Sequence, residues 1–220
     1  MLRTRGRAAD RRASVAAPSR ITPRAHAGFP PSDAGRQAVE PHSIGTIRAM
    51  GADEPTPLAI RLATASDSGA IAEIYNREVT ETTATFDLVP RTVEAQRAWL
   101  ADRSGAFAAI VGVDPVTRRV IAFASLSPYK ERAAYRTTVE NSIYVHRDFA
   151  GRGVGRQMLT HLLGVARESG FHSVMARIEA SSETSRALHR ACGFELVGIE
   201  RQVGRKFNRW LDVAVMQHLL

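Results

Sequence analysis

The alternation of hydrophobic and polar residues divides the chain from residue 58 onward into short strands and helices. Period-two alternation or β-branched content predicts seven strands, which are 58–64, 106–113, 119–126, 137–145, 173–180, 194–204 and 209–217. Apolar residues at helical spacing predict four helices, which are 66–79, 92–103, 154–168 and 183–192. Ser66 or Asp67 is placed to cap the first helix, and Gly170 to end the third. This order of elements predicts an α/β domain with a mixed sheet.

Composition narrows the class of protein. The chain has 220 residues, of which 44% are hydrophobic, so it can bury one good core. No apolar run approaches the roughly 18 residues that a membrane span requires. The single cysteine, Cys192, excludes a disulfide framework and a thiolate metal site, and the histidines show no metal spacing. We therefore expect a cytoplasmic protein without a metal.

Positive charge is concentrated at the N-terminus. Residues 1–49 carry nine arginines and three acidic residues, which is about +6 of the formal net charge of +8. This segment lacks a sustained period, so we expect residues 1–57 to be disordered and 58–220 to form one domain. The segment could be a transit-like leader, a basic arm for nucleic acid, or sequence upstream of a true start at Met50, which we favour. Because the remainder is close to neutral, we do not expect a nucleic-acid partner.

A glycine-rich turn, "AGRGVG", stands between the strand 137–145 and the helix 154–168. The first N–H groups of a helix lack intrahelical partners and the helix dipole is positive there, so such a turn can bind phosphate. It is not a Walker loop, and its G-x-G-x-G spacing departs from the dinucleotide fingerprint. The turn alone leaves open whether it binds an anion, although Arg152 and Arg156 favour binding.

The wider window "NSIYVHRDFAGRGVGRQMLTHLLGVAR" resembles the acetyl-CoA loop of the GNAT superfamily of N-acetyltransferases. Ala150 stands where that superfamily prefers Gln or Arg. The resemblance implies the GNAT fold, a twisted and mostly antiparallel mixed sheet with splayed central strands, flanked by helices. It also implies contacts with acetyl-CoA from the strand, the turn and a later helix, at Ile143, Tyr144, Val145, Ala150, Gly151, Arg152, Gly153, Val154, Gly155, Arg156, Ser182 and Ser185.

Three more blocks sharpen the resemblance. "IYNREVTETTATFD", "YKERAAYRTTVENSIYV" and "ALHRACGFELVGIERQVGRKFNRWLDVAVMQ" are similar to the phosphinothricin and methionine sulfone/sulfoximine acetyltransferases, from about Ile60 to the C-terminus. Ser182 stands where that group usually carries Asn. The resemblance implies transfer of an acetyl group from acetyl-CoA to the primary amine of a small amino-acid-like substrate, by a homodimer.

Two residues are candidates for the chemistry. A thioester is already activated, so the protein has to align a neutral amine and accept its proton. Glu140 matches the group's acidic residue, which implies a general base, whereas spacing alone favours a surface or edge-strand glutamate. His189 matches the group's acid/base histidine, and a structural histidine is the alternative.

Substrate recognition is expected before the catalytic strand. In "YKERAAYR", guanidinium groups and hydroxyls suit the carboxylate and phosphinate or sulfone oxygens of an amino acid analogue. For two of the aromatic candidates, in "IYN" and "ATFD", core packing is an equally good interpretation. The candidates are Tyr75, Phe86, Lys130, Arg132, Tyr135, Arg136 and Trp210.

Two other functions remain open. One is an acetyltransferase for protein N-termini or lysines, and the other is a non-catalytic acyl-CoA-binding regulator. The blocks 75–87, 129–140 and 206–212 favour the small-molecule enzyme. Detoxification of an inhibitor and acetylation of a metabolic by-product would use the same pocket, so the physiological amine stays open.

Overall fold

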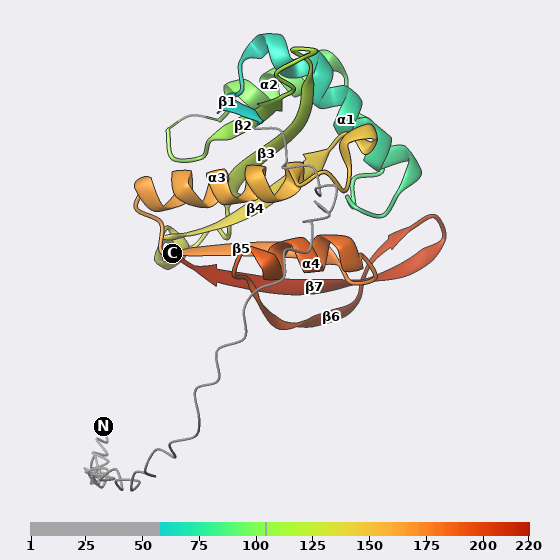
Figure 1. Cartoon of the computed structure of the whole chain (residues 1–220). Coiled ribbons are helices and arrows are strands. Elements are labelled where there is room, and N and C mark those ends of the chain that lie inside the picture. The colour runs from blue at the N-terminus through green and yellow to red at the C-terminus, as the bar shows by residue number, and fades with distance from the viewer. Residues whose placement is uncertain (1–57, 104) are drawn as a thin grey trace, which may run out of the picture. The chain divides into compact units, whose positions relative to one another are not determined.

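A seven-stranded sheet forms the centre of the domain in the computed structural model, which describes residues 58–103 and 105–220 (Figure 1). The predictions for residues 1–57 lie outside this range. The strands follow the order β1-β2-β3-β4-β5-β7-β6 across the sheet. Their bounds are β1 (Ala59–Leu62), β2 (Ala109–Val113), β3 (Val120–Pro128), β4 (Thr138–Val145), β5 (Ser173–Glu179), β6 (Glu195–Lys206) and β7 (Arg209–Leu219). Within this range, β4 and β5 are the parallel pair and the other neighbours are antiparallel.

Four α-helices flank the sheet, in the order that the sequence predicts. They are α1 (Ser68–Glu81), α2 (Val93–Ala101), α3 (Val154–Glu168) and α4 (Glu183–Ala191). Short 3-10 turns cover 65–67, 133–135 and 147–149. In the described part of the chain, none of the helices has the length and apolarity that crossing a membrane would require.

The start of α1 differs from the prediction. Asp67 occupies the N-cap position but makes no side-chain capping bond to α1. Its carboxylate instead accepts hydrogen bonds from Thr64 N at 2.7 Å and from the Arg61 guanidinium at 2.7 and 2.8 Å. These bonds hold the pKa of Asp67 at about 2, with the Arg61 contact as the largest cause. Asp67 therefore fastens the end of β1 to the entrance of α1.

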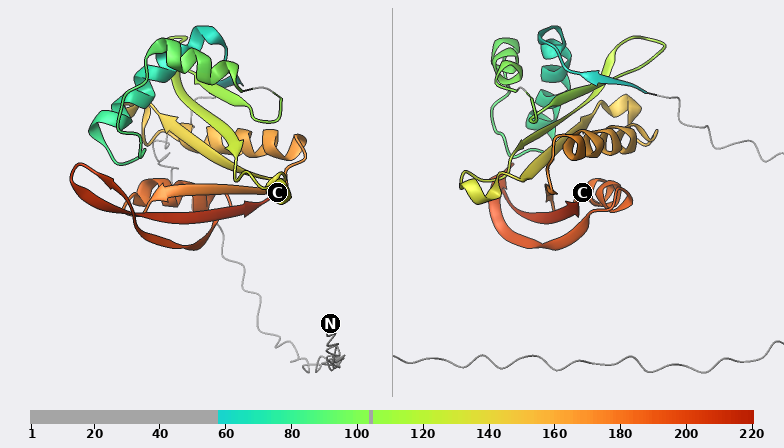
Figure 2. Two further views of the ribbon diagram at one scale, coloured as in Figure 1. Left: turned by 180° about the vertical axis from the view of Figure 1, so that it is seen from behind. Right: turned by 90° about the vertical axis from the view of Figure 1, so that its left-hand side faces the viewer.

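The two faces of the sheet carry separate parts of the core. Ile110 and Ala122 face the cluster that includes the buried side of α3, whereas Val111 and Phe123 face the cluster of α1 and α2. Adjacent strand residues point to opposite faces, so this alternation places the helices on both sides (Figure 2). α3 is amphipathic because Met158, Leu159, Leu162 and related positions recur at helical spacing and are fully buried.

The central strands diverge after a short contact. β4 pairs with β5 only over Thr138–Glu140 and Ser173–Met175. Beyond Glu140, β4 stays paired with β3 as far as Val145, and β5 stays paired with β7. The predicted splayed strands of the GNAT fold are thus confirmed, and residues 141–145 of β4 have no strand partner on the side that faces β5.

Candidate active site

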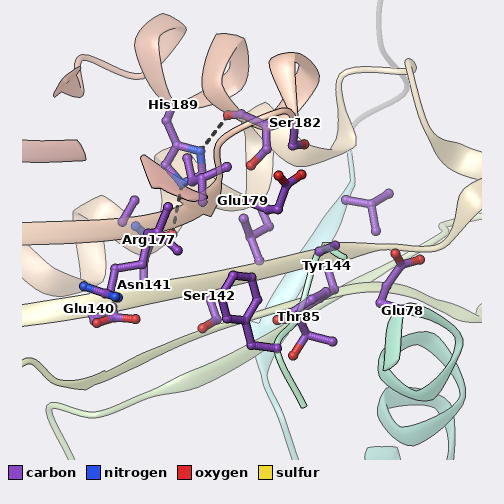
Figure 3. A pocket seen from close by; sticks show the side chains of 18 residues that line it. Glu78, Thr85, Glu140, Asn141, Ser142, Tyr144, Arg177, Glu179, Ser182 and His189 are labelled. Carbon is purple, nitrogen blue, oxygen red and sulfur yellow. Dashed lines mark hydrogen bonds between the residues drawn. The ribbon is translucent and has the colours of Figure 1, made fainter. Parts of the chain in front are cut away.

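The space between the diverging strands is a cavity of about 420 Å³ (Figure 3). Residues 140–145 of β4 line one side and residues 176–179 of β5 the other. The helix α4 and its N-cap contribute further lining residues, and so do the segment 84–86 that follows α1, Glu78 and Val213. Segments far apart in sequence therefore meet at one site.

Glu140 lies at the base of the divergence, where it is the last β4 residue paired with β5. It is half-buried, and burial is the largest cause that raises the pKa of its carboxyl. The Arg177 charge opposes this increase and the Glu200 charge adds to it. Arg177 donates through both terminal nitrogens to Glu200, at 3.0 Å for Nη1. A carboxylate with a raised pKa is a better proton acceptor near neutral pH.

His189 is almost fully buried and connects α4 to β4. Its Nδ1 lies 2.8 Å from Ser185 O, and its Nε2 lies 3.2 Å from Asn141 Oδ1. The Asn141 amide is oriented by donation from Nδ2 to Met175 O at 3.0 Å, so both imidazole nitrogens face an oxygen (Figure 3). Burial lowers the pKa of His189, and a neutral ring carries only one N–H. Only one of the two ring nitrogens can therefore donate a hydrogen bond to the oxygen that it faces.

The predicted cofactor residues fall into two groups. Five of them line the cavity, from β4 and α4, and these are Ile143, Tyr144, Val145, Ser182 and Ser185. The turn 150–156 does not line it but adjoins it, because a Cβ on Gly155 would lie 3.1 Å from Leu188 Cδ2 and 3.8 Å from Val145 Cγ2. The structure thus brings both groups to the open end of the divergence.

The N-terminus of α3 is suited to an anion. No side chain caps this helix, and its Gly153 N-cap has φ of 75°, which favours glycine. The amide of Gln157 bonds to Gly153 O at 3.1 Å, so the three preceding helical amides lie before the first intrahelical bond. The exposed side chains of Arg152 and Arg156 flank this end. A phosphate or pyrophosphate group fits these donors and the positive end of the helix dipole.

Two of the predicted substrate residues are associated with the segment after α1: Phe86 belongs to it, and Tyr75 of α1 contacts it. Phe86 lines the cavity. Tyr75 is buried and lies behind it, where its hydroxyl contacts Thr85 Oγ1 at 2.9 Å and donates to Asp87 Oδ2 at 2.6 Å. Burial, and then the bond to Asp87, raises the pKa of Tyr75 to about 12. Tyr75 therefore supports the cavity wall through Thr85.

The other predicted substrate residues do not line this cavity. Lys130, Arg132, Tyr135 and Arg136 are exposed in the connection between β3 and β4. Trp210 is also exposed and lines a separate hollow of about 360 Å³. Their roles in substrate binding stay predictions.

Sequence reasoning missed six polar residues of the cavity, which are Glu78, Thr85, Asn141, Ser142, Arg177 and Glu179. Glu179 is buried and accepts hydrogen bonds from Ser181 N at 3.1 Å and Ser181 Oγ at 2.6 Å. For the residues in β4 and β5, the available signal was a polar side chain inside a largely apolar strand. This signal indicates a site only once the two strands are known to be neighbours. In the described ranges, no three His, Cys, Asp or Glu side chains gather as a metal site would need.

The protein-family model for the acetyltransferase (GNAT) domain matches residues 60–215 of the sequence. The chain belongs to the GNAT acetyltransferase family. This confirms the resemblance found in the glycine turn and its neighbouring strand and helix. A curated relative, the L-methionine sulfoximine/L-methionine sulfone acetyltransferase of Pseudomonas aeruginosa, is 38% identical over 159 residues, which cover 72% of this chain and 92% of the relative.

Two solved structures share the fold at similar identity. The phosphinothricin acetyltransferase from Sinorhizobium meliloti, in complex with AcCoA, is 36% identical with a TM-score of 0.71, covering 74% of this chain and 88% of the other. The ribosomal-protein-alanine N-acetyltransferase from Brucella melitensis is 38% identical with a TM-score of 0.72, covering 74% and 100%. Proteins named for small-molecule and for protein acceptors therefore both resemble this chain.

Proposed function

We propose that this GNAT acetyltransferase moves an acetyl group from acetyl-CoA to the primary amine of a small amino-acid-like molecule, of the phosphinothricin or methionine sulfoximine/sulfone type. One observation carries the proposal: the diverging strands place the uncapped start of α3 and the half-buried Glu140 along one opening. The names of the Pseudomonas and Sinorhizobium proteins support the choice of acceptor.

In this proposal, acetyl-CoA lies along β4. The backbone amides of the turn 150–156 bind its pyrophosphate, helped by Arg152 and Arg156. The edge of residues 141–145, which has no strand partner toward β5, pairs with the amides of the pantetheine arm. Ala150 is compatible with this arrangement because backbone amides, and not its side chain, make the contacts.

The proposed chemistry is direct transfer in a ternary complex. Glu140 accepts a proton from the ammonium group of the substrate, and the resulting amine attacks the thioester carbonyl carbon. A C–N bond forms, the C–S bond breaks, and the leaving thiolate takes up the second proton that the nitrogen loses, which gives the amide and free thiol. Burial of Glu140 supports its role as the base, since it raises the pKa of the carboxyl. His189 assists by orienting Asn141, whose Oδ1 lies 3.2 Å from the imidazole Nε2.

We also propose that the enzyme is a homodimer. β6 is an edge strand, and an exposed apolar edge strand invites pairing with another chain. Exposed apolar side chains follow β6 and its turn into β7, namely Leu196, Val197, Ile199, Val203, Phe207 and Trp210. Sedimentation velocity of the full chain should give twice the 24.0 kDa monomer mass, and a monomer at every concentration would contradict the proposal.

Acetyl transfer to a protein acceptor, such as an N-terminus, is the second candidate, because the Brucella protein is named a ribosomal-protein-alanine N-acetyltransferase. Release of free thiol from acetyl-CoA by the full chain separates the two. The acceptors would be phosphinothricin, methionine sulfoximine, methionine sulfone, plain amino acids and a peptide that begins with alanine. We expect the highest kcat/KM with the sulfoximine, the sulfone or phosphinothricin. A higher kcat/KM for the peptide would reverse the order of the two candidates.

A further inference from the structure

Lys206 is a buried lysine that the proposed chemistry does not use. The chain holds two lysines among its 30 lysine and arginine residues, and this one, at the end of β6, is only 4% exposed. Its Nζ donates to Thr85 O at 2.7 Å and to Glu78 O at 3.3 Å. A compact ammonium with three donors can bind two carbonyl oxygens at such a site, which a planar guanidinium would fill differently.

The two carbonyl groups belong to one wall of the cavity. Glu78 lies in the last turn of α1, and Thr85 lies in the segment that follows, and both residues line the cavity. A cation is favourable at this position because the C-terminal end of a helix carries a partial negative charge. Lys206 therefore joins the end of α1 to the segment 84–86 from a strand more than 100 residues further along the chain.

Gly204 makes a second contact with the same segment. A Cβ built on Gly204 would lie 2.5 Å from Phe86 Cδ2 and closer still to Cε2. The Phe86 ring thus rests against the backbone of β6 in a space that only glycine leaves open. Gly204 and Lys206 are two residues apart on one strand, so both act from the same face.

We propose that Lys206 and Gly204 form a latch that positions Thr85 and Phe86 as the selectivity wall for the amine substrate. The inference rests on the proposed function. From the opposite side, the Tyr75 hydroxyl contacts Thr85 Oγ1, so the segment is fixed between α1 and β6. The latch residues themselves do not line the cavity, and neither belongs to β4 or the glycine turn. Loosening the latch should therefore alter binding of the amine acceptor and leave binding of the donor, acetyl-CoA, unchanged.

The test compares two latch variants with two matched controls in the full chain. Lys206→Met removes both hydrogen bonds with little change of volume, and Gly204→Ala displaces the Phe86 ring. The controls are Arg201→Met, an exposed cation on the same strand, and Gly198→Ala, where an added Cβ meets nothing within 4 Å. We expect both latch variants to raise KM for the preferred amine about tenfold and to change the order of amines, since 1.4 kcal/mol lost corresponds to a factor of ten.

KM for acetyl-CoA should stay within about twofold of the wild-type value in all four variants, because a latch on the acceptor wall does not touch the donor side. An equal rise in both KM values, or an unchanged amine KM in both latch variants, would overturn the latch. If Lys206→Met fails to fold, Gly204→Ala decides, since it adds only a methyl group.

Hydrogen exchange separates failure of the latch from failure of the proposed function. Amides of the segment 82–92 should exchange faster in the latch variants than in the wild type and the controls, whether or not any amine is acetylated. Unchanged exchange in both latch variants would reject the latch even in an active enzyme. A wild-type protein that acetylates none of the amines would reject the proposed function, while faster exchange would still support the latch.

Discussion

The two walls of the cavity are built in different ways. On the side where we propose that acetyl-CoA binds, residues 140–145 of β4 line the cavity and the glycine turn 150–156 adjoins them, so this donor wall and its turn come from neighbouring parts of the chain and would offer mainly backbone groups. The wall at Thr85 and Phe86 depends on side chains and on Lys206, which is separated from Thr85 by 121 positions. A backbone wall tolerates side-chain changes such as Ala150, whereas a wall held by long-range side-chain contacts can change with single substitutions. Acceptor choice should therefore vary more easily than donor choice.

The largest effect is expected for Glu140→Gln, which keeps the shape of the side chain and removes the base. General-base catalysis contributes about 10²- to 10⁴-fold, so kcat should fall by that factor with the best amine. Binding of acetyl-CoA should not change, because the contacts that we propose for it lie beyond residue 140. Thiol release and calorimetric titration of acetyl-CoA measure the two quantities. An unchanged kcat would remove Glu140 from the chemistry.

The donor wall can be disturbed at one glycine and left intact at another. Gly153 has φ of 75°, a conformation that costs a non-glycine residue about 1–2 kcal/mol. Gly153→Ala should weaken acetyl-CoA binding about tenfold with an unchanged KM for the amine. The control is Gly164→Ala inside α3, where an added Cβ meets nothing within 4 Å and alanine favours the helix. Equal acetyl-CoA affinities in the two variants would argue against the anion site.

A pair of substitutions next to Glu140 should shift the pH dependence in opposite directions. The Arg177 charge lowers the pKa of Glu140 and the Glu200 charge raises it. The base works when it is deprotonated. Arg177→Met should therefore raise the pKa of Glu140 and move the acid limb of the pH profile of kcat/KM to higher pH. Glu200→Gln should move the limb to lower pH, because it removes a negative charge and releases Arg177. Shifts in the same direction, measured over the full pH range, would contradict this account of the base.

Local patterns predicted the order of helices and strands and the family, because strand alternation, helical spacing and the glycine turn are written in adjacent residues. The start of α1 was missed by two residues, since Asp67 binds Arg61 and Thr64 in place of the helix. Lys206 and Glu179 could not be placed in the site from sequence. Each acquires its surroundings only through tertiary contacts between distant elements.

The exposed segment around Arg132 also shows that residue type alone does not place a side chain in the site. Its residue types suit an anionic substrate, yet the sequence does not say where the connection between β3 and β4 will lie. In the structure it lies outside the cavity.

The central claim is that donor and acceptor occupy the two walls at the same time and react directly. Initial velocities measured over a matrix of acetyl-CoA and amine concentrations test this claim most directly. The account predicts intersecting lines in double-reciprocal plots and no acetylated enzyme in the mass spectrum of protein mixed with acetyl-CoA alone. The only thiol, Cys192, does not line the cavity, which agrees with that expectation. Parallel lines together with an acetyl-enzyme would contradict direct transfer.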